Sequence, residues 1–128
     1  MIAVLRCGCG CSTPDDVRES VEHVYGLVLR GFGDLGMVEV KSGYRCAARN
    51  KAVGGAKNSM HVLGRAIDFK VALPGGEYVA ASALALHAEA MIGSGVLPQG
   101  GVGTYGRYPG LLHYDDRGSK ARWWHENA

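Results

Sequence analysis

The side chains best suited to chemistry are two histidines and one aspartate: His61, Asp68 and His113. Two imidazoles and one carboxylate, with the fourth position left to water, form the ligand set of a catalytic zinc site, whereas structural zinc sites are closed by four protein ligands. We therefore predict that these three residues bind one Zn²⁺ ion. His61 and Asp68 belong to the stretch 42–68, which also contains Arg45 and Ser59, two further residues that could take part in catalysis or binding.

Further polar residues accompany the predicted ligands. Asp115 follows His113 by two positions in a strand-like segment, so both side chains face the same way, and we predict Asp115 as the general base. Asp116 would face the opposite side. Arg45 offers a planar fork for a substrate carboxylate or a transition-state oxygen, with a surface salt bridge as the alternative. Ser59 would orient a ligand or the substrate, or else serve as a turn or cap residue.

The N-terminal half contains a helix that would act as scaffold. Residues 13–16 read Thr-Pro-Asp-Asp, which predicts a helix start with Thr13 as the cap and Pro14 at the first helical position. An apolar stripe at helical spacing then continues to the breaker at 31–33. The stripe consists of Val17, Val21, Val24 and Val28.

The remaining elements are mostly strands. Alternating residues predict strands at 37–41, 66–72, 102–105 and 111–115, and helices are expected within 46–60 and over 78–92. Within 66–72, Ile67, Phe69 and Val71 share one face, which frees Asp68 to point to the other. We interpret the glycines at 100–103 as turn and close-packing residues rather than a phosphate cradle, since no P-loop Lys follows them.

Composition limits the class of protein. The length of 128 residues predicts a single domain over residues 1–128, with residues 1–12 as a cysteine-containing N-terminal strap. No apolar run reaches the roughly 18 residues that a membrane span needs. The net charge of +2 is too small, and the basic residues too scattered, to predict nucleic-acid binding. The N-terminus lacks the long apolar region of a secretory signal peptide, so we expect none.

Four cysteines, Cys7, Cys9, Cys11 and Cys46, include three that alternate with glycine. Their spacing is not the C-x2-C of common zinc modules. Three interpretations stay open: one or two disulfides or close thiol pairs that tie the strap to Cys46, buried free thiols, and a structural metal site. The spacing favours the first of these. No Cys has a His nearby in sequence that would activate it, so none is predicted to be catalytic.

Several motifs together resemble one known family. They are S-G-Y-R-C at 42–46, S-x-H-x-x-G-x-A-x-D at 59–68, G-V-G-x-Y at 101–105, L-H-x-D-x-R at 112–117 and A-R-W at 121–123. The combination is similar to the zinc D-alanyl-D-alanine carboxypeptidase family of cell-wall peptidases, the M15 group, through most of the chain after residue 40. The CGC near the N-terminus also resembles the cysteine-containing leader of short bacterial and phage members.

The resemblance implies a small α+β fold, an antiparallel sheet flanked by helices, that is shared with the hedgehog signalling domain. It also implies one bound zinc ion and cleavage of peptidoglycan stem peptides. The family's metal ligands would fall on His61, Asp68 and His113, and its substrate-binding Arg and Ser on Arg45 and Ser59.

One position departs from the family pattern. Many relatives carry the catalytic carboxylate three residues before the last His, where this chain has Gly110. Either Asp115 acts as the base, as the H-x-D form of the motif suggests, or the chain is weakly active or inert. In the second case it would be a zinc-containing cell-wall-binding or signalling-type module, which is our alternative to an enzyme.

A different enzyme class also fits the C-terminal residues. His113, Asp115 and a later His125 have the form of the two-His, one-carboxylate site of non-haem iron oxygenases. Such enzymes need a larger barrel than this chain can build, and the interpretation leaves His61 and Asp68 without a purpose. Zinc is therefore the predicted cofactor.

The predicted activity is that of a zinc metallopeptidase with a peptidoglycan stem peptide as its partner. The sequence leaves open whether the enzyme trims a terminal D-Ala as a carboxypeptidase or cleaves within the stem, for example at the L-Ala–D-Glu bond, as an endopeptidase. We expect a monomer that acts at the bacterial cell wall. A phage lysis or tail-associated enzyme is preferred over a bacterial one.

Overall fold

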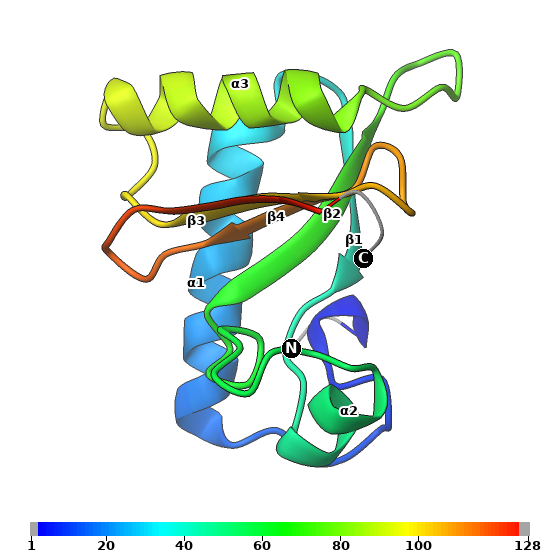
Figure 1. Ribbon diagram of the computed structural model, residues 1–128, viewed down its shortest axis with the longest axis vertical. Coiled ribbons are helices and arrows are strands. Elements are labelled where there is room, and N and C mark those ends of the chain that lie inside the picture. The colour runs from blue at the N-terminus through cyan, green and yellow to red at the C-terminus, as the bar shows by residue number, and fades with distance from the viewer. Residues whose placement is uncertain (1–2, 126–128) are drawn as a thin grey trace.

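A computed structural model describes residues 3–125 of the chain (Figure 1). In chain order the elements are the 3₁₀ helix η1 (Ala3–Leu5), α1 (Asp15–Phe32), β1 (Met37–Ser42), α2 (Ala47–Ala52), β2 (Ala66–Ala72), α3 (Ala81–Gly93), β3 (Gly101–Tyr105), β4 (Leu112–Asp115) and β5 (Ala121–His125). Within this range, no helix combines the length and the apolar character that crossing a membrane requires.

The five strands form one sheet in the order β1-β2-β4-β3-β5. Neighbouring strands are antiparallel except for β3 and β5, which run parallel. The predicted α+β class is confirmed, and the first four strands form the antiparallel sheet that the resemblance implied. The edge strand β5 makes the sheet mixed, and the sequence pattern did not predict it.

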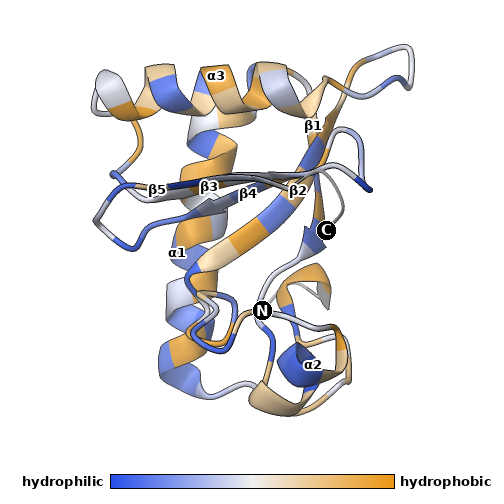
Figure 2. Ribbon diagram, in the orientation of Figure 1, coloured by the Kyte–Doolittle hydropathy of each residue, from blue (hydrophilic) through white to orange (hydrophobic). Residues whose placement is uncertain are grey.

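Both long helices pack on the same face of the sheet. The helix α1 contacts β1 and β2, and α3 contacts β3 and β4. Along α1, hydrophobic and hydrophilic residues alternate, as Figure 2 shows, and the buried ones include Val21, Val24 and Val28 of the predicted stripe. Thr13 does not cap this helix: Pro14 occupies the N-cap position, where no side chain caps the helix.

Alternation along β2 separates the core from the opposite face. Ile67, Phe69 and Val71 are completely buried, and the ring of Phe69 meets that of Phe32 from α1 edge-on, with 4.9 Å between the ring centroids. Asp68 points the other way, as predicted, because successive strand residues face opposite sides of the sheet. The helix-free face is therefore available for polar side chains.

Helix α3 begins three residues later than the predicted range. Tyr78 forms an isolated antiparallel bridge with Ala72, and the Val79 N–H donates to the Val71 carbonyl at 3.0 Å. These bonds extend the edge of β2 and keep the chain out of helical conformation until Ala81.

The N-terminal strap packs beside the segment that follows β1. Leu5 is completely buried, and its carbonyl accepts the N–H of Tyr44 at 3.0 Å. In Figure 1, η1 and α2 lie close together at the lower end of the molecule, away from α3. This packing brings the start of the chain next to the residues 42–46.

Candidate metal centre

One row of residues crosses the helix-free face of the sheet. The strand register pairs residues from all five strands in this row. From β1 to β5 they are Ser42, Asp68, His113, Gly103 and Trp123. Because paired residues in neighbouring strands share a face, Asp68 and His113 are placed side by side by the sheet itself.

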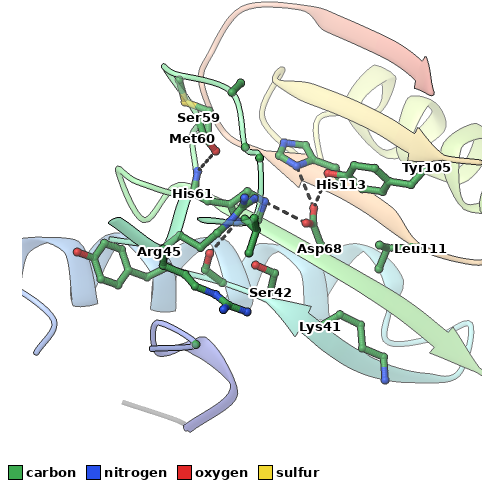
Figure 3. A pocket seen from close by; sticks show the side chains of 18 of the residues that line it. Lys41, Ser42, Arg45, Ser59, Met60, His61, Asp68, Tyr105, Leu111 and His113 are labelled. Carbon is green, nitrogen blue, oxygen red and sulfur yellow. Dashed lines mark hydrogen bonds and ion pairs between the residues drawn. The ribbon is translucent and has the colours of Figure 1, made fainter. Parts of the chain in front are cut away.

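Three metal-binding side chains converge on this row. Asp68 Oδ1 lies 3.0 Å from His113 Nδ1, and Asp68 Oδ2 lies 3.1 Å from His61 Nε2. One ligand atom from each residue lies within 4.8 Å of the other two. Figure 3 shows the two imidazoles pointing at the carboxylate of Asp68. All three predicted ligands are thus brought together, and each is buried.

His61 comes from the loop before β2 and is held there by its backbone and by one ring nitrogen. The Ser59 hydroxyl accepts the N–H of His61 at 3.2 Å, and the carbonyl of His61 accepts the N–H of Arg45 at 3.0 Å. The ring Nδ1 lies 2.7 Å from the carbonyl oxygen of Gly43. Since a carbonyl only accepts, Nδ1 carries the proton and Nε2 presents a lone pair.

The state of His61 Nε2 tests whether the residues fit a metal. This atom is buried and has no hydrogen-bond partner among the described residues, although Asp68 Oδ2 lies 3.1 Å away. A buried unpaired ring nitrogen is costly unless something else binds it. A lone pair aimed into a cluster with a carboxylate and a second imidazole is what a zinc ion uses. The residues therefore fit the predicted ion.

Gly64, in the same loop, explains the glycine of the S-x-H-x-x-G motif. Its φ is +68°, and a Cβ there would lie 2.6 Å from a side-chain carbon of Val17 in α1. The loop can approach the helix this closely only with glycine. This contact positions the loop that carries His61.

Asp115 holds His113 from its other side. Its Oδ2 lies 2.7 Å from His113 Nε2 and 2.8 Å from Arg117 Nη2. Its Oδ1 accepts three N–H groups, from Gly101 and from the backbone and Nε of Arg117, at 2.8–3.2 Å. Asp115 is completely buried. A carboxylate that binds the second nitrogen of a ligand His fixes its tautomer and its orientation.

The glycines of β3 make room for these side chains. A Cβ at Gly101 would lie 2.2 Å from Asp115 Oδ2, and one at Gly103 would lie 2.1 Å from the indole of Trp123. That indole packs on the His113 ring, with 4.6 Å between the ring centroids. The prediction that these glycines serve close packing is confirmed for both positions.

Position 110, where many relatives carry the catalytic carboxylate, is occupied by a glycine in a conformation that favours glycine. Its φ is +82°, and an added Cβ would lie 3.4 Å from Tyr78 Cβ and from the Val79 carbonyl. A carboxylate residue at this position would be strained in that backbone conformation. The role of Asp115 as general base stays a prediction, although its hydrogen bonds are those of a group that orients His113.

The protonation of the site follows from its charges. Burial opposes ionisation of Asp68, but the nearby imidazole of His61 and the hydrogen bond to His113 hold its pKa well below the usual range. Burial also opposes charge on His113, yet Asp115 and Asp68, one at each ring nitrogen, raise its pKa. Burial and Asp68 raise the pKa of Tyr105, whose hydroxyl donates to Asp68 Oδ1 at 3.2 Å. A metal ion would therefore compete with a proton on His113 Nδ1.

A groove of about 1120 Å³ opens over the three ligands. Among the described residues that line it, Asp68 carries the only carboxylate, whereas six side chains are cationic. The cations are Arg6, Lys41, Arg45, Arg49, Arg107 and Arg117. This excess of positive charge favours an anionic ligand.

Arg45 lines this groove. Its Nη1 donates to Asn50 Oδ1 at 3.1 Å, and Asn50 Nδ2 donates to the Ala56 carbonyl at 2.8 Å, so the guanidinium is held in place. Its Nε is buried and has no hydrogen-bond partner among the described residues. A guanidinium fixed beside the groove is suited to a carboxylate.

No role was predicted from the sequence for four side chains around the site. Tyr105, Arg117 and Trp123 surround the site, and Asn50 supports Arg45. The first three belong to the motifs that carry the family resemblance. Their contacts with the predicted ligands depend on strand register and hydrogen bonding, which the sequence does not state.

The alternative iron site is not assembled by the same residues. His113 Nε2 and Asp115 Oδ2 bond to one another, so neither atom points into an open coordination position. The side chain of His125 lies outside the described part of the chain. The cluster of His61, Asp68 and His113 remains the candidate centre.

Comparison with protein families gives a match over most of the chain. A family model described as Peptidase M15 matches residues 4–105. The matched range contains His61 and Asp68 and ends before His113 and Asp115. No curated protein and no solved structure matches the chain.

Proposed function

The chain belongs to the peptidase M15 family, a family of metallopeptidases, and we propose that it is a zinc-dependent peptidase that hydrolyses a stem-peptide bond of peptidoglycan. The observation that carries the proposal is the buried, unpaired Nε2 of His61, which faces Asp68 beside His113. In a metallopeptidase, such an atom would bind the metal ion.

Zinc is the metal that this donor set favours. Two imidazoles and one carboxylate leave a position of the tetrahedron for water or substrate, as in catalytic zinc sites. Zinc bound there would supply Lewis acidity that polarises the scissile carbonyl and activates water. The protein's part is to fix the ligands, and it does so through Gly43 for His61 and Asp115 for His113.

The cationic groove supports an acidic peptide as the substrate. Stem peptides carry several carboxylates, and Arg45 would bind one of them through the part of its guanidinium that lines the groove. Ser59 would act mainly by holding the backbone of His61, since its hydroxyl accepts that N–H. Binding through Arg45 places the bond to be cut relative to the metal centre.

Asp115 acts, in this proposal, as a positioning residue for His113. Both of its oxygens are occupied by N–H donors, and no oxygen faces the groove unpaired. Its low pKa has the same origin, because burial opposes its charge but Arg117 and His113 outweigh that effect. A group held this strongly as a carboxylate is a poor acceptor for a proton from water.

A catalytically weak wall-binding or signalling-type module is the second candidate. It is favoured by the absence of any carboxylate other than Asp68 among the described residues of the groove. Such a module would bind the same acidic peptide at the same cations without cutting it. In either case we propose that the protein acts at the bacterial cell wall as a monomer. We prefer a phage protein, which would reach the wall during lysis or as part of the virion.

A defined stem pentapeptide separates the two candidates. The zinc-loaded protein is incubated with the peptide, and mass spectrometry identifies any fragments. We expect cleavage at one bond, lost on chelation and lost in His61→Ala, with Ser12→Ala as the unaffected control. Binding of the peptide without any cleavage would establish the module instead and reject the peptidase.

A further inference from the structure

The four cysteines form a second cluster, separate from the site of His61, Asp68 and His113, which we call the histidine site. Cys7, Cys9 and Cys11 of the strap meet Cys46, and one sulfur from each lies within 4.8 Å of all the others. Cys7 and Cys9 Sγ lie 3.3 Å apart, and Cys46 Sγ lies 3.6 Å from each of them. All four are free thiols. We call these four residues the thiol cluster.

The sulfur separations bear on two of the interpretations that the sequence left open, disulfides and a metal site. A disulfide bond joins its sulfurs at about 2.05 Å. Four thiolates at about 2.3 Å from a tetrahedral zinc ion lie about 3.8 Å from one another. The measured separations are close to the second value and well above the first. Two disulfides would group the sulfurs into two separate pairs, whereas here all four lie near one another, as around a single ion.

The backbone is shaped to bring the strap sulfurs together. The Gly10 N–H donates to the Cys7 carbonyl at 3.0 Å, which closes a turn, and the φ of Gly10 is +78°. Glycine reaches this conformation without steric cost. The alternating glycines thus allow three cysteines, at every second position, to face one point.

Polar groups around the sulfurs suit thiolates. The Cys46 N–H donates to Cys7 Sγ, and the Arg49 N–H donates to Cys46 Sγ, each at 3.4 Å. The guanidinium of Arg49 lies over Gly8, where a Cβ would be 3.1 Å from its Nε. Hydrogen bonds and a nearby cation stabilise the negative charge that four thiolates and one divalent ion carry together.

We propose that the thiol cluster binds a second, structural zinc ion. Four protein ligands close the coordination sphere, so this ion would hold the chain together rather than act on a substrate. It would link the strap to the segment 42–46, in which Gly43 accepts the His61 ring and Arg45 faces the groove. The second ion would thereby support the first site without contact to it. This inference does not depend on the proposed peptidase activity.

Metal content of the full chain, purified reduced and without chelator, is the test. We expect two zinc ions per chain in the wild type and one in His61→Ala. Cys9→Ser and Cys11→Ser should each keep only the histidine-site ion, and Ser12→Ala in the same strap should keep both. Cys9 is exposed and bonds only to other thiols, so its replacement disturbs little else.

Cobalt substitution gives a reading that does not need the cysteine variants to fold. Thiolate-to-cobalt charge transfer in the near ultraviolet should appear in the wild type and in His61→Ala, because an imidazole and carboxylate site has no such band. If the histidine site failed to bind metal, the wild type would hold one zinc ion that His61→Ala retains. That outcome would reject the proposed function and leave the thiol cluster supported.

The opposite results would overturn the inference. They are a single zinc ion that His61→Ala loses, or a mass, measured under denaturing and non-reducing conditions, that is lower by two hydrogens for each disulfide. Equal reactivity of all four thiols with and without zinc would reject it as well.

Discussion

Replacing Asp115 with Asn separates a positioning role from a role as general base. Both oxygens of Asp115 accept N–H donors, so an amide NH₂ must face a donor whichever way it turns. If it faces His113, the ring must present a lone pair on Nε2 and carry its proton on Nδ1, the atom beside Asp68. The substitution thus favours the tautomer that cannot bind the metal through Nδ1.

The expected loss is in metal affinity. Removing the partner of a ligand His typically costs 10- to 100-fold in affinity, or about 1.4–2.8 kcal/mol. Competition with a chromogenic chelator measures it, and peptidase activity is then recorded at saturating zinc, where we expect most of it to return. Asp116→Asn is the matched control. Asp116 also accepts a hydrogen bond from an arginine, Arg65 Nε at 2.9 Å, but it contacts neither His113 nor the other predicted ligands in the bonds that the structure shows.

The result that would refute this reasoning is equally specific. If Asp115→Asn binds zinc as tightly as the wild type and loses about 100-fold or more in kcat at saturating zinc, Asp115 is the base. The hydrogen bonds to His113 would then be secondary to proton transfer.

Three further predictions concern the surroundings of the site. Gly103→Ala should destabilise the fold by about 1–3 kcal/mol and weaken zinc binding, because its Cβ displaces the indole of Trp123; chemical denaturation measures the first effect, and an unchanged midpoint would contradict it. Arg45→Ala should lower kcat/KM for an acidic peptide about 10- to 100-fold, mainly through KM, whereas Arg107→Ala at the exposed rim should change it little. In the presence of a chelator, thermal stability should fall as the pH rises. The pKa of His113 is higher in the folded protein than its value of 6.5 in the unfolded chain, so its protonation stabilises the fold fully below pH 6.5, and this stabilisation is lost as the pH passes the folded pKa. Bound zinc should remove this dependence, and equal pH profiles with zinc and with chelator would contradict the prediction.

The orientation of two of the predicted ligands, Asp68 and His113, follows from local rules. Alternation along the strand at 66–72 frees Asp68 from the core, and the same rule puts His113 and Asp115 on one face of β4. Register then completes the site, since Asp68 and His113 are paired residues of β2 and β4. Two short periodic segments thus predicted which way these side chains face, whereas the choice of His61, Asp68 and His113 as ligands also rested on the family resemblance.

The features that escaped prediction depend on contacts between distant residues. The strand β5 pairs in parallel with β3, and only that pairing places Trp123 on His113. Whether Asp115 faces a water molecule or the His113 ring is decided by which groups occupy its oxygens, and spacing alone carries no such information. The cysteine spacing likewise did not favour a metal site, because a turn between Cys7 and Gly10 decides where the sulfurs meet.

Digestion of intact peptidoglycan tests the central claim most directly. Purified sacculi are incubated with the zinc-loaded protein, with the chelated protein and with His61→Ala, and the released fragments are identified by mass spectrometry. We predict cleavage of one kind of stem-peptide bond by the zinc-loaded protein alone, restored to the chelated sample by added zinc. Intact stem peptides in a sample shown to contain zinc at His61, Asp68 and His113 would contradict the account.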